Sequence, residues 1–315
     1  MLFFWVVGSV NALESSERSF SISSHSLYQH LDAQYSLAPN QLNLGGSPLH
    51  PDDSIILSTF IHGHNTLSHV DLSACDLSDK TSELIVASLM QHPNLTYLNL
   101  SLNGLGKRTA QALELLTLKV RAIHHLDLRI NDFPEMSLVP LLKNLKEHDK
   151  ITYLDLSFNS FTGKSVDGLC DLVQGCTSLK RLHLTCIGLA GTKRTNILSA
   201  FGQSLSLSEL SLAYNSFAQQ GKEIGQMIKT CKTLTILNLS HCNLSFTDFC
   251  RLFDQINSSM PQQLNSILFP FTQPKTRLVQ VKLEDTPITR FIKRYYEQRK
   301  PETPRIELNL LLGSS

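Results

Sequence analysis

Three aspartates at a regular spacing are the first residues whose pattern suggests chemistry. Asp71, Asp127 and Asp155 stand 56 and 28 residues apart, and each lies between two apolar residues. Paired carboxylates can share general acid–base work when they lie close together. Alternation of polar with apolar residues, however, is the pattern of a strand with one side in solvent. We therefore interpret these carboxylates as part of a solvated face and predict no catalytic pair.

Histidines offer a second candidate chemistry, because imidazole is a common zinc ligand. The candidates are His62 with His64, and the adjacent pair His124 and His125. Adjacent residues of a strand point to opposite sides, which disfavours joint ligation by the second pair. The sequence also lacks a Ser-His-Asp order, a phosphate-binding glycine-rich loop and an H-E-x-x-H motif. We predict that the protein is not an enzyme and has no catalytic residues, no metal and no cofactor.

The composition is that of a folded protein without a strong charge. Of 315 residues, 42% are hydrophobic and 17% charged, which excludes disorder driven by charge. Lys and Arg number 28 against 27 Asp and Glu, so neither nucleic acid nor an anionic membrane is an expected partner. The seven cysteines are widely spaced and odd in number, which predicts reduced, mostly buried thiols in a reducing compartment.

A repeat of 28 residues runs through most of the chain. In one copy the frame L-x-x-L-x-L-x-x-N/C-x-L is filled by Leu95, Leu98, Leu100, Asn103 and Leu105. Seven copies keep this phase, with starts 28, 28, 28, 28, 28 and 27 residues apart. The copies begin at Leu67, Leu95, Ile123, Ile151, Leu179, Leu207 and Leu234. A fixed period of this length indicates a solenoid of stacked repeats.

The residue types of the repeat predict its local structure. The fourth and sixth places, such as Leu98 and Leu100, alternate with polar residues and should point inward from a strand. The Asn at the ninth place should leave the strand and bind the backbone of adjacent repeats. Ile187 stands at that place in the fifth copy and cannot make such bonds. We expect a looser turn there, with Cys186 displaced inward.

Each repeat also carries a helical pattern after its strand. Apolar residues at helical spacing include Leu84, Ala87 and Leu89 in the first copy and Leu169, Leu172 and Val173 in the fourth. One repeat cannot bury its own apolar face, so stability must come from stacking on neighbours. This alternation of strand and helix resembles the ribonuclease-inhibitor-like class of leucine-rich repeats. The resemblance implies an α/β right-handed horseshoe with a parallel concave sheet, outer helices and a role in binding proteins.

The two ends depart from the repeat. We expect an N-terminal cap over residues 1–36, a solenoid over 37–263, and irregular repeats with a C-terminal tail over 264–315. Leu42, Leu44 and Leu49 indicate a degenerate first repeat. Leu264, Ile267 and Phe269 suggest an eighth strand, yet Leu278, Val281 and Leu283 fit the frame 44 residues after Leu234, so an insertion and shortened repeats both stay open. Thr289–Lys300 indicates a basic helix, and Ile306, Leu308 and Leu310 a closing strand.

The apolar segment Met1–Ala12 has no basic start and is too short to span a bilayer, which takes about 20 apolar residues. We favour an uncleaved cap on the solenoid. A cleaved signal peptide and a membrane-surface anchor stay open. No other segment reaches membrane length, so no integral membrane segment is expected.

Function in such a solenoid should lie at the variable strand places that face the concave side, since the repeated leucines carry stability. The third and fifth places, and the turn after them, combine aromatic and charged residues, which favour interfaces. We predict a partner-binding site made by Tyr97, Asn99, Asp127, Arg129, Tyr153, Asp155, Phe158, Arg181, His183 and Tyr214.

The repeat sequences, such as LDLSFNSF and LSLAYNSF, and the residue types of the tail are similar to those of leucine-rich effectors of intracellular bacteria such as Legionella. That resemblance implies a monomer that binds a host protein, located in the cytoplasm or delivered into the host cytosol. Two alternatives stay open. One is an adaptor for an enzyme, such as a ubiquitin ligase recognition subunit or a GTPase-activating protein, and the other is a eukaryotic cytosolic inhibitor of the ribonuclease-inhibitor type.

Overall fold

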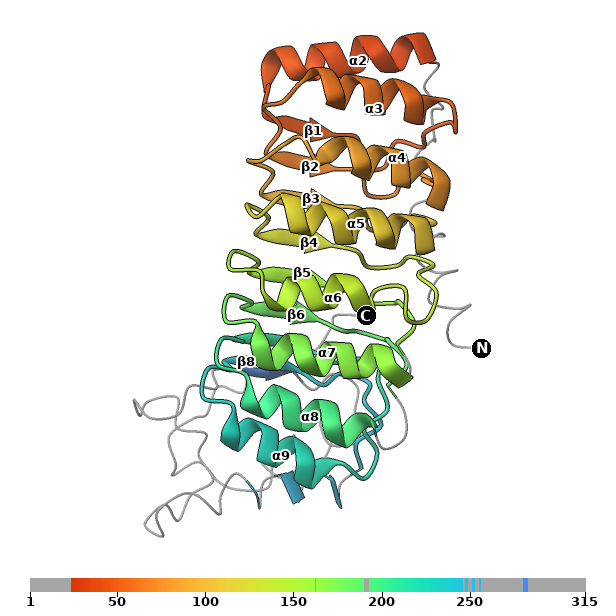
Figure 1. Cartoon of the computed structure of the whole chain (residues 1–315). Coiled ribbons are helices and arrows are strands. Elements are labelled where there is room, and N and C mark those ends of the chain that lie inside the picture. Colours follow the sequence, from red (N-terminus) through yellow and green to blue (C-terminus); the bar gives the residue numbers. More distant parts are fainter. Residues whose placement is uncertain are drawn as a thin grey trace, which may run out of the picture.

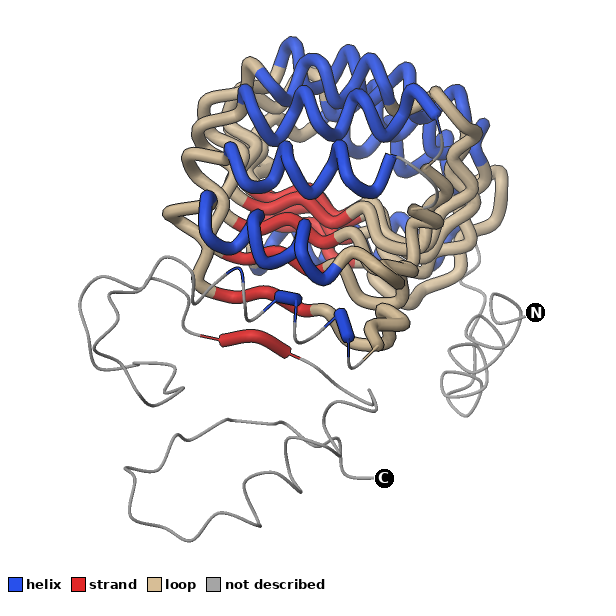
Figure 2. The backbone as a smooth tube through the Cα atoms, turned by 90° about the horizontal axis from the view of Figure 1, so that it is seen from below, coloured by secondary structure: helices blue, strands red, loops and turns tan. Residues whose placement is uncertain are grey.

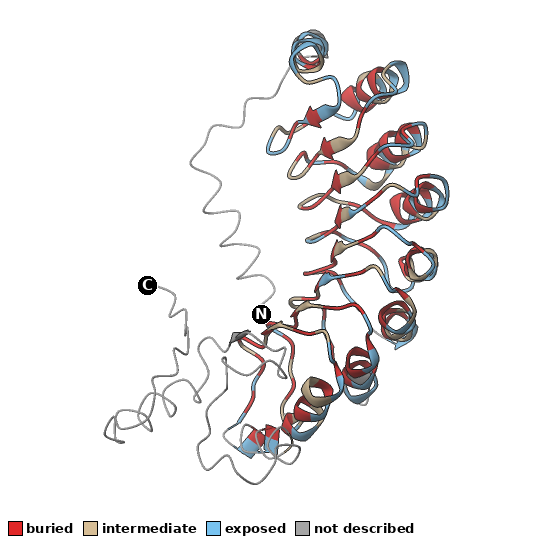
Figure 3. Ribbon diagram, turned by 90° about the vertical axis from the view of Figure 1, so that its left-hand side faces the viewer, coloured by how far each residue is buried: buried red, intermediate tan, exposed pale blue. Residues whose placement is uncertain are grey.

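The computed structural model describes residues 24–161, 163–189, 193–245, 247–248, 251–252, 255 and 280–282. Over these residues it is one curved stack of repeats, with strands on the inner side of the arc and helices on the outer side (Figures 1 and 3). Predictions for Met1–Ala12, the strand at 264–269, the basic helix, the closing strand and the effector-like tail fall outside the described residues.

The strands form one parallel sheet whose spatial order is the order of the sequence. Within the described part it has nine strands, each three residues long, and they lie together inside the ring of helices (Figure 2). The strands are β1 Gln41–Asn43, β2 His69–Asp71, β3 Tyr97–Asn99, β4 His125–Asp127, β5 Tyr153–Asp155, β6 Arg181–His183, β7 Glu209–Ser211, β8 Ile236–Asn238 and β9 Gln280–Lys282.

Helices connect the strands and cover the convex side of the sheet (Figure 3). They are α2 Ser24–Leu37, α3 Asp53–Gly63, α4 Asp79–Leu89, α5 Lys107–Lys119, α6 Val139–Lys146, α7 Gly163–Gly175, α8 Lys193–Gln203 and α9 Gly221–Thr230. Each helix packs against the helix of the next repeat. Helices are wider than strands, so stacking both in one column bends the stack around the sheet.

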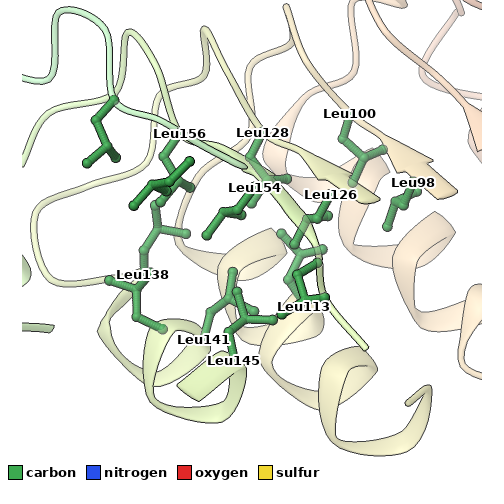
Figure 4. Packing of buried hydrophobic residues seen from close by; sticks show 14 of the residues in the cluster. Leu98, Leu100, Leu113, Leu126, Leu128, Leu138, Leu141, Leu145, Leu154 and Leu156 are labelled. Atoms are coloured by element: carbon green, nitrogen blue, oxygen red, sulfur yellow. The ribbon is translucent and has the colours of Figure 1, made fainter. Parts of the chain in front are cut away.

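The register confirms the repeat frame. Leu98 pairs with Leu126, and Leu126 with Leu154, across three neighbouring strands. These side chains are fully buried and point toward the helices, together with leucines of α5 and α6 such as Leu113 and Leu141 (Figure 4). The inward leucines of all repeats thus build one continuous apolar core.

The helical face of the first repeat was predicted wrongly in part. Leu84 is 44% exposed on the outside of α4 and Ala87 is exposed too, whereas Ile85 and Val86 are buried; Leu89 is buried, as predicted. Several apolar residues follow one another here, so the spacing alone fits two neighbouring faces. The fourth repeat is as predicted, because Leu169, Leu172 and Val173 are all buried.

The Asn ladder forms as expected. The Nδ2 of Asn103 donates to the Leu72 carbonyl of the preceding repeat at 2.8 Å, and its Oδ1 accepts the Cys75 and Leu77 amides at 3.1 and 3.0 Å. Asn131 and Asn215 donate in the same way to Leu100 and Leu184. Backbone groups that leave the sheet are satisfied by these amides.

The expected loosening at Ile187 does not occur. Ile187 is fully buried, and the Oδ1 of Asn215 accepts the Ile187 amide at 3.1 Å. Cys186 is half-buried and has φ 53°, the value of the equivalent residue in the other repeats, so it is not displaced inward. Asn215 of the next repeat stabilises this turn, and a prediction made from one repeat alone does not include that contact.

Both ends of the described solenoid carry irregular repeats. Leu42 of β1 and Leu44, which directly follows β1, are buried, which confirms the degenerate first repeat. At the other end β9 pairs directly with β8, with Val281 opposite Leu237. Of the two alternatives for this region, the pairing therefore supports the insertion, because 41 residues separate Asn238 from Gln280 while their strands are neighbours.

Candidate functional site

A stack of four aromatic rings crosses the concave face. His69, Tyr97, His125 and Tyr153 hold the third place of β2–β5, and we call them the ring ladder. Successive ring centroids lie 3.9, 4.3 and 4.0 Å apart, with interplanar angles of 7°, 17° and 3°. Strands in register lie about 4.8 Å apart, so rings at one place in neighbouring repeats fall at stacking distance.

Stacking decides which parts of the ring ladder a partner can reach. The inner rings, Tyr97 and His125, have both faces covered by neighbouring rings, so their edges are what remain accessible. At the far end the guanidinium carbon of Arg181 lies 5.1 Å from the centroid of Tyr153. All four rings are half-buried, and Arg181 is exposed. The result is a strip of ring edges that ends in a cation.

Three rings of the ring ladder, Tyr97, His125 and Tyr153, are uncharged at neutral pH. Burial, with Arg181 and His69 nearby, lowers the pKa of His125 to about 4. Burial and the neighbouring Asp155 raise the pKa of Tyr153 above its usual value, and burial with Asp71 does the same for Tyr97. Tyr97, His125 and Tyr153 therefore offer hydroxyl and imidazole edges that donate and accept hydrogen bonds without carrying a charge.

At the fifth place of β3–β5 the polar side chains are buried, which corrects the prediction of a solvated face for Asp127 and Asp155, while Asp71 is half-buried. Asn99, Asp127 and Asp155 are 7%, 5% and 3% exposed. Each accepts the backbone N–H two residues later, as Asp127 Oδ1 does from Arg129 at 3.1 Å and Asp155 Oδ1 from Ser157 at 2.8 Å. These side chains stabilise the turn out of the strand and lie beside the third place on the same face of the sheet.

The two buried carboxylates differ in their neighbours. Burial and the facing Asp155 raise the pKa of Asp127 to about 6, although Arg129 lies 3.5 Å from its Oδ2. Burial would raise the pKa of Asp155 too, but hydrogen bonds from His183 and Ser157 outweigh burial and lower it. Asp155 is thus the more firmly charged of the two.

His183 joins two carboxylates. Its Nδ1 lies 3.4 Å from Asp155 Oδ2, and its Nε2 lies 3.2 Å from Glu209 Oε1. Burial would lower the pKa of His183, but these two hydrogen bonds raise it above the usual value. The hydroxyl of Tyr153 lies 3.3 Å from the same Nδ1. The ring ladder is therefore linked to the charged groups at its C-terminal end.

A second row of side chains follows the turns. Leu102, Ile130, Phe158 and Tyr214 have φ values of 58°, 53°, 57° and 56°, a region that L residues rarely adopt. Tyr214 is 43% exposed and stacks on the ring of His241 at 4.2 Å, whereas Phe158 is half-buried. The row borders the ring ladder along the ends of the strands.

The structure brings most of the predicted site residues together. Tyr97, Tyr153 and Arg181 share the ring ladder or its end. Arg129 pairs with Asp127, and His183 with Asp155. Asn99 donates to Asp71 Oδ2 at 3.1 Å, and Phe158 and Tyr214 stand apart in the turn row.

Sequence reasoning left out three residues of this surface, namely His69, His125 and Glu209. His69 and His125 complete the ring ladder, and Glu209 forms a hydrogen bond with Nε2 of His183. All three stand at the third place of the repeat. Reading that place as one column of laterally touching side chains could have found the two histidines.

Other site chemistry is not seen in the described segments. They contain no group of three or more metal-ligating side chains, and no helix in them is long and apolar enough to cross a bilayer. Six described cysteines are free thiols, and burial raises the pKa of Cys75 and Cys242 to about 12. Such thiols are poor nucleophiles and behave as core residues.

Comparisons with known proteins find repeats of one kind. A pattern described as Leucine Rich repeat matches residues 91–113 and 230–245, and one described as Leucine Rich Repeat matches residues 150–172. No curated protein sequence matches the chain.

Three solved structures are similar to the chain at low identity. An internalin (inlF) from Listeria monocytogenes is 14% identical over 72% of both chains, with a TM-score of 0.45. The plant peptide hormone receptor RGFR1 in complex with RGF2 is 18% identical over 80% of this chain and 38% of its own, with a TM-score of 0.42. Leiomodin-1 actin-binding site 2 is 15% identical over 55% of this chain and 86% of its own, with a TM-score of 0.32. Similarities this low do not bear on function. The in-phase strands, the stacked helices and the matched repeats make this chain an α/β leucine-rich-repeat solenoid.

Proposed function

We propose that this protein is a binding module that holds a partner protein on the concave face of its sheet, across the ring ladder. The observation that carries the proposal is the placement of four half-buried rings and Arg181 in one line on that face. Tyr and Arg are the residue types that dominate binding energy at interfaces. The stack fixes each ring before a partner arrives, so little side-chain entropy is lost on binding.

The surroundings of the ring ladder support the same proposal. Asn99, Asp127 and Asp155 form a buried column beside the rings, where the Tyr153 hydroxyl donates to Asp155 Oδ2 at 3.4 Å, and the turn row adds Ile130 and Phe158. Apolar edges beside fixed polar groups suit a protein surface better than a small molecule. We propose that the module acts by binding alone, without a reaction of its own.

The test compares two triple variants of equal size. Tyr97→Ala/Tyr153→Ala/Arg181→Ala removes the concave anchors, and Leu84→Ala/Leu115→Ala/Leu118→Ala removes exposed leucines of α4 and α5 on the convex side. A partner captured from host-cell lysate and then purified should bind the convex variant like the wild type. Binding to the concave variant should fall at least about a hundredfold, as expected when several interface anchors are lost.

Circular dichroism must show that both variants are folded at the assay temperature. Equal affinity of the partner for the concave variant would refute the site. Chemical modification of the partner by the purified chain would refute action by binding alone.

Two finer assignments belong to the same proposal. The 28-residue period with helices of 11 to 13 residues in α4, α5 and α7 favours the ribonuclease-inhibitor-like class. The amino-acid sequence of the repeats at Leu154–Phe161 and Leu210–Phe217 favours a monomeric bacterial effector that binds its partner in the host cytosol. A translocation reporter fused to the whole chain should reach host cytosol, and deletion of residues 301–315 should stop it. Equal delivery from a bacterial strain that lacks the secretion system for such effectors would contradict the effector assignment.

A further inference from the structure

The side chains at the third place of the concave face change from aromatic to charged and aliphatic where the ring ladder ends. Beyond Tyr153 the third place is held by Arg181, Glu209 and Ile236, none of which carries a ring. The ring of His183 meets Tyr153 at 75°, so the parallel stack stops there. The fifth place of β7 is Ser211, a small side chain. The absence of rings at the third place and the small side chain of Ser211 leave space on the concave side of β6–β8.

This space is a hollow of about 230 Å³ on the concave side. Its walls are formed by His183, Glu209, Leu210, Ser211, Ile236 and Asn238. Pockets for small molecules measure roughly 300–1,000 Å³. The hollow is smaller than that, and its size suits one long side chain of a partner that lies across the ring ladder.

The charge of the hollow comes from Glu209. Of its lining residues only His183 and Glu209 are ionisable. His183 stands between two carboxylates, with its Nδ1 3.4 Å from Asp155 Oδ2 and its Nε2 3.2 Å from Glu209 Oε1, so at most one positive charge faces two negative ones. One negative charge is therefore in excess, and it faces the hollow on Glu209, whose side chain is 31% exposed, because Asp155 is buried.

Among the described side chains, neither arginine of this face forms an ion pair with Glu209. The guanidinium of Arg181 lies over the ring of Tyr153 and is not part of the lining. Arg129 pairs with Asp127 on β4, two strands away from β6. Inside the hollow, Ile236 offers an apolar wall, and Ser211 and Asn238 offer polar groups.

We propose that this hollow receives an arginine or lysine side chain of the partner protein, with its charged end on Glu209 and its aliphatic part against Ile236. The inference rests on the proposed function and adds the chemistry of one contact. A long basic side chain combines an apolar stem with a charged head, which is the combination that the lining offers. The ring ladder would orient the partner, and Glu209 would select it.

The first test uses small probes on the folded protein. Ac-Gly-Arg-Gly-NH2 is titrated against isotope-labelled protein, and its matched control contains citrulline, which has the same shape without the charge. The arginine peptide should shift the amide signals of residues 209–211 and 236–238 and bind about tenfold more tightly than the citrulline peptide, a difference of roughly 1.4 kcal/mol. Equal binding of both peptides, or no shift at these residues, would overturn the proposal, as would tighter binding of a glutamate peptide.

The second test uses the Glu209→Gln variant. Glutamine keeps an oxygen that can accept from His183 Nε2, so the fold should persist while the charge is lost. Glu83→Gln is the control, because Glu83 is also ion-paired and partly exposed but lies on α4. Affinity for the arginine peptide and for the captured partner should fall about tenfold in Glu209→Gln only.

The two proposals fail in different ways. Full partner affinity in Glu209→Gln, together with loss of binding in the Tyr97/Tyr153/Arg181 variant, would overturn the basic contact and leave the concave site standing. Full affinity in both variants would overturn the concave site itself.

Discussion

Replacement of Asp127 by Asn should stabilise the protein at neutral and alkaline pH. Asp127 is 5% exposed, and it stands beside Asp155 on the next strand. Asn holds the same place in β3 and β8, where Asn99 and Asn238 each accept the backbone N–H two residues on. The amide can therefore take over the turn hydrogen bond of Asp127 and removes only its charge.

The magnitude follows from the pKa of Asp127, which rises from 3.8 to about 6 on folding. Because the folded value is the higher one, folding favours the protonated form. The contribution of Asp127 is fully present below about 3.8 and is lost as the pH rises through about 6. At about 1.36 kcal/mol per unit, the charge opposes folding by about 3 kcal/mol at pH 8 and about half of that at pH 5.

The folded pKa of about 6 already includes the attraction of Arg129, whose side chain is 45% exposed, so the ion pair is not subtracted again. Asp127→Asn should therefore raise the free energy of unfolding by about 3 kcal/mol at pH 8 and by about half of that at pH 5. Urea denaturation followed by circular dichroism at both pH values measures this difference.

Asp155→Asn is the matched control, since it stands at the same place one strand on and should act with the opposite sign. The lowered pKa of Asp155 means that its charge stabilises the fold above about 3.8 and that this stability is lost at lower pH. Its replacement should therefore destabilise the protein at pH 8. A loss of stability in Asp127→Asn at pH 8, or an effect that does not change with pH, would refute the reasoning.

Three further changes test other parts of the fold. His125→Phe keeps a ring in the ring ladder without a group that titrates. Because burial lowers the pKa of His125 to about 4, the stability of the wild type should fall as the pH drops from about 6.5. The variant should lose less stability between pH 7 and pH 5 in the same denaturation assay. Asp79→Ala removes acceptors for the Gly106 and Thr109 amides, each 2.8 Å from Asp79 Oδ1 at the start of α5, and should lower the unfolding free energy by about 1–2 kcal/mol in urea. Leu126→Ala opens a cavity in the fully buried core and should cost about 3 kcal/mol, seen as a lower melting temperature; an unchanged value would contradict the shared interior.

The concave surface shows what a repeat pattern can and cannot predict. The third and fifth places were identified as facing the concave side, and Tyr97, Tyr153 and Arg181 do so. Burial at the fifth place was not predicted, because a short polar residue looks the same in sequence whether it faces water or a turn amide. His69 and His125 were not included in the predicted site, although each stacks on a ring of the next repeat, 28 positions away.

The amino-acid sequence by itself determined the repeat length, the inward leucines and the in-phase strands, because these depend on residue types that recur at one period within each copy. It also determined the Asn ladder, since an amide side chain carries both the donor and the acceptor that satisfy backbone groups of adjacent repeats. The tertiary structure alone decided the ring ladder, the pairing of Asp155 with His183, and the hollow beside Glu209. These features arise between copies, where lateral stacking sets distances, burial and pKa values that no single repeat contains.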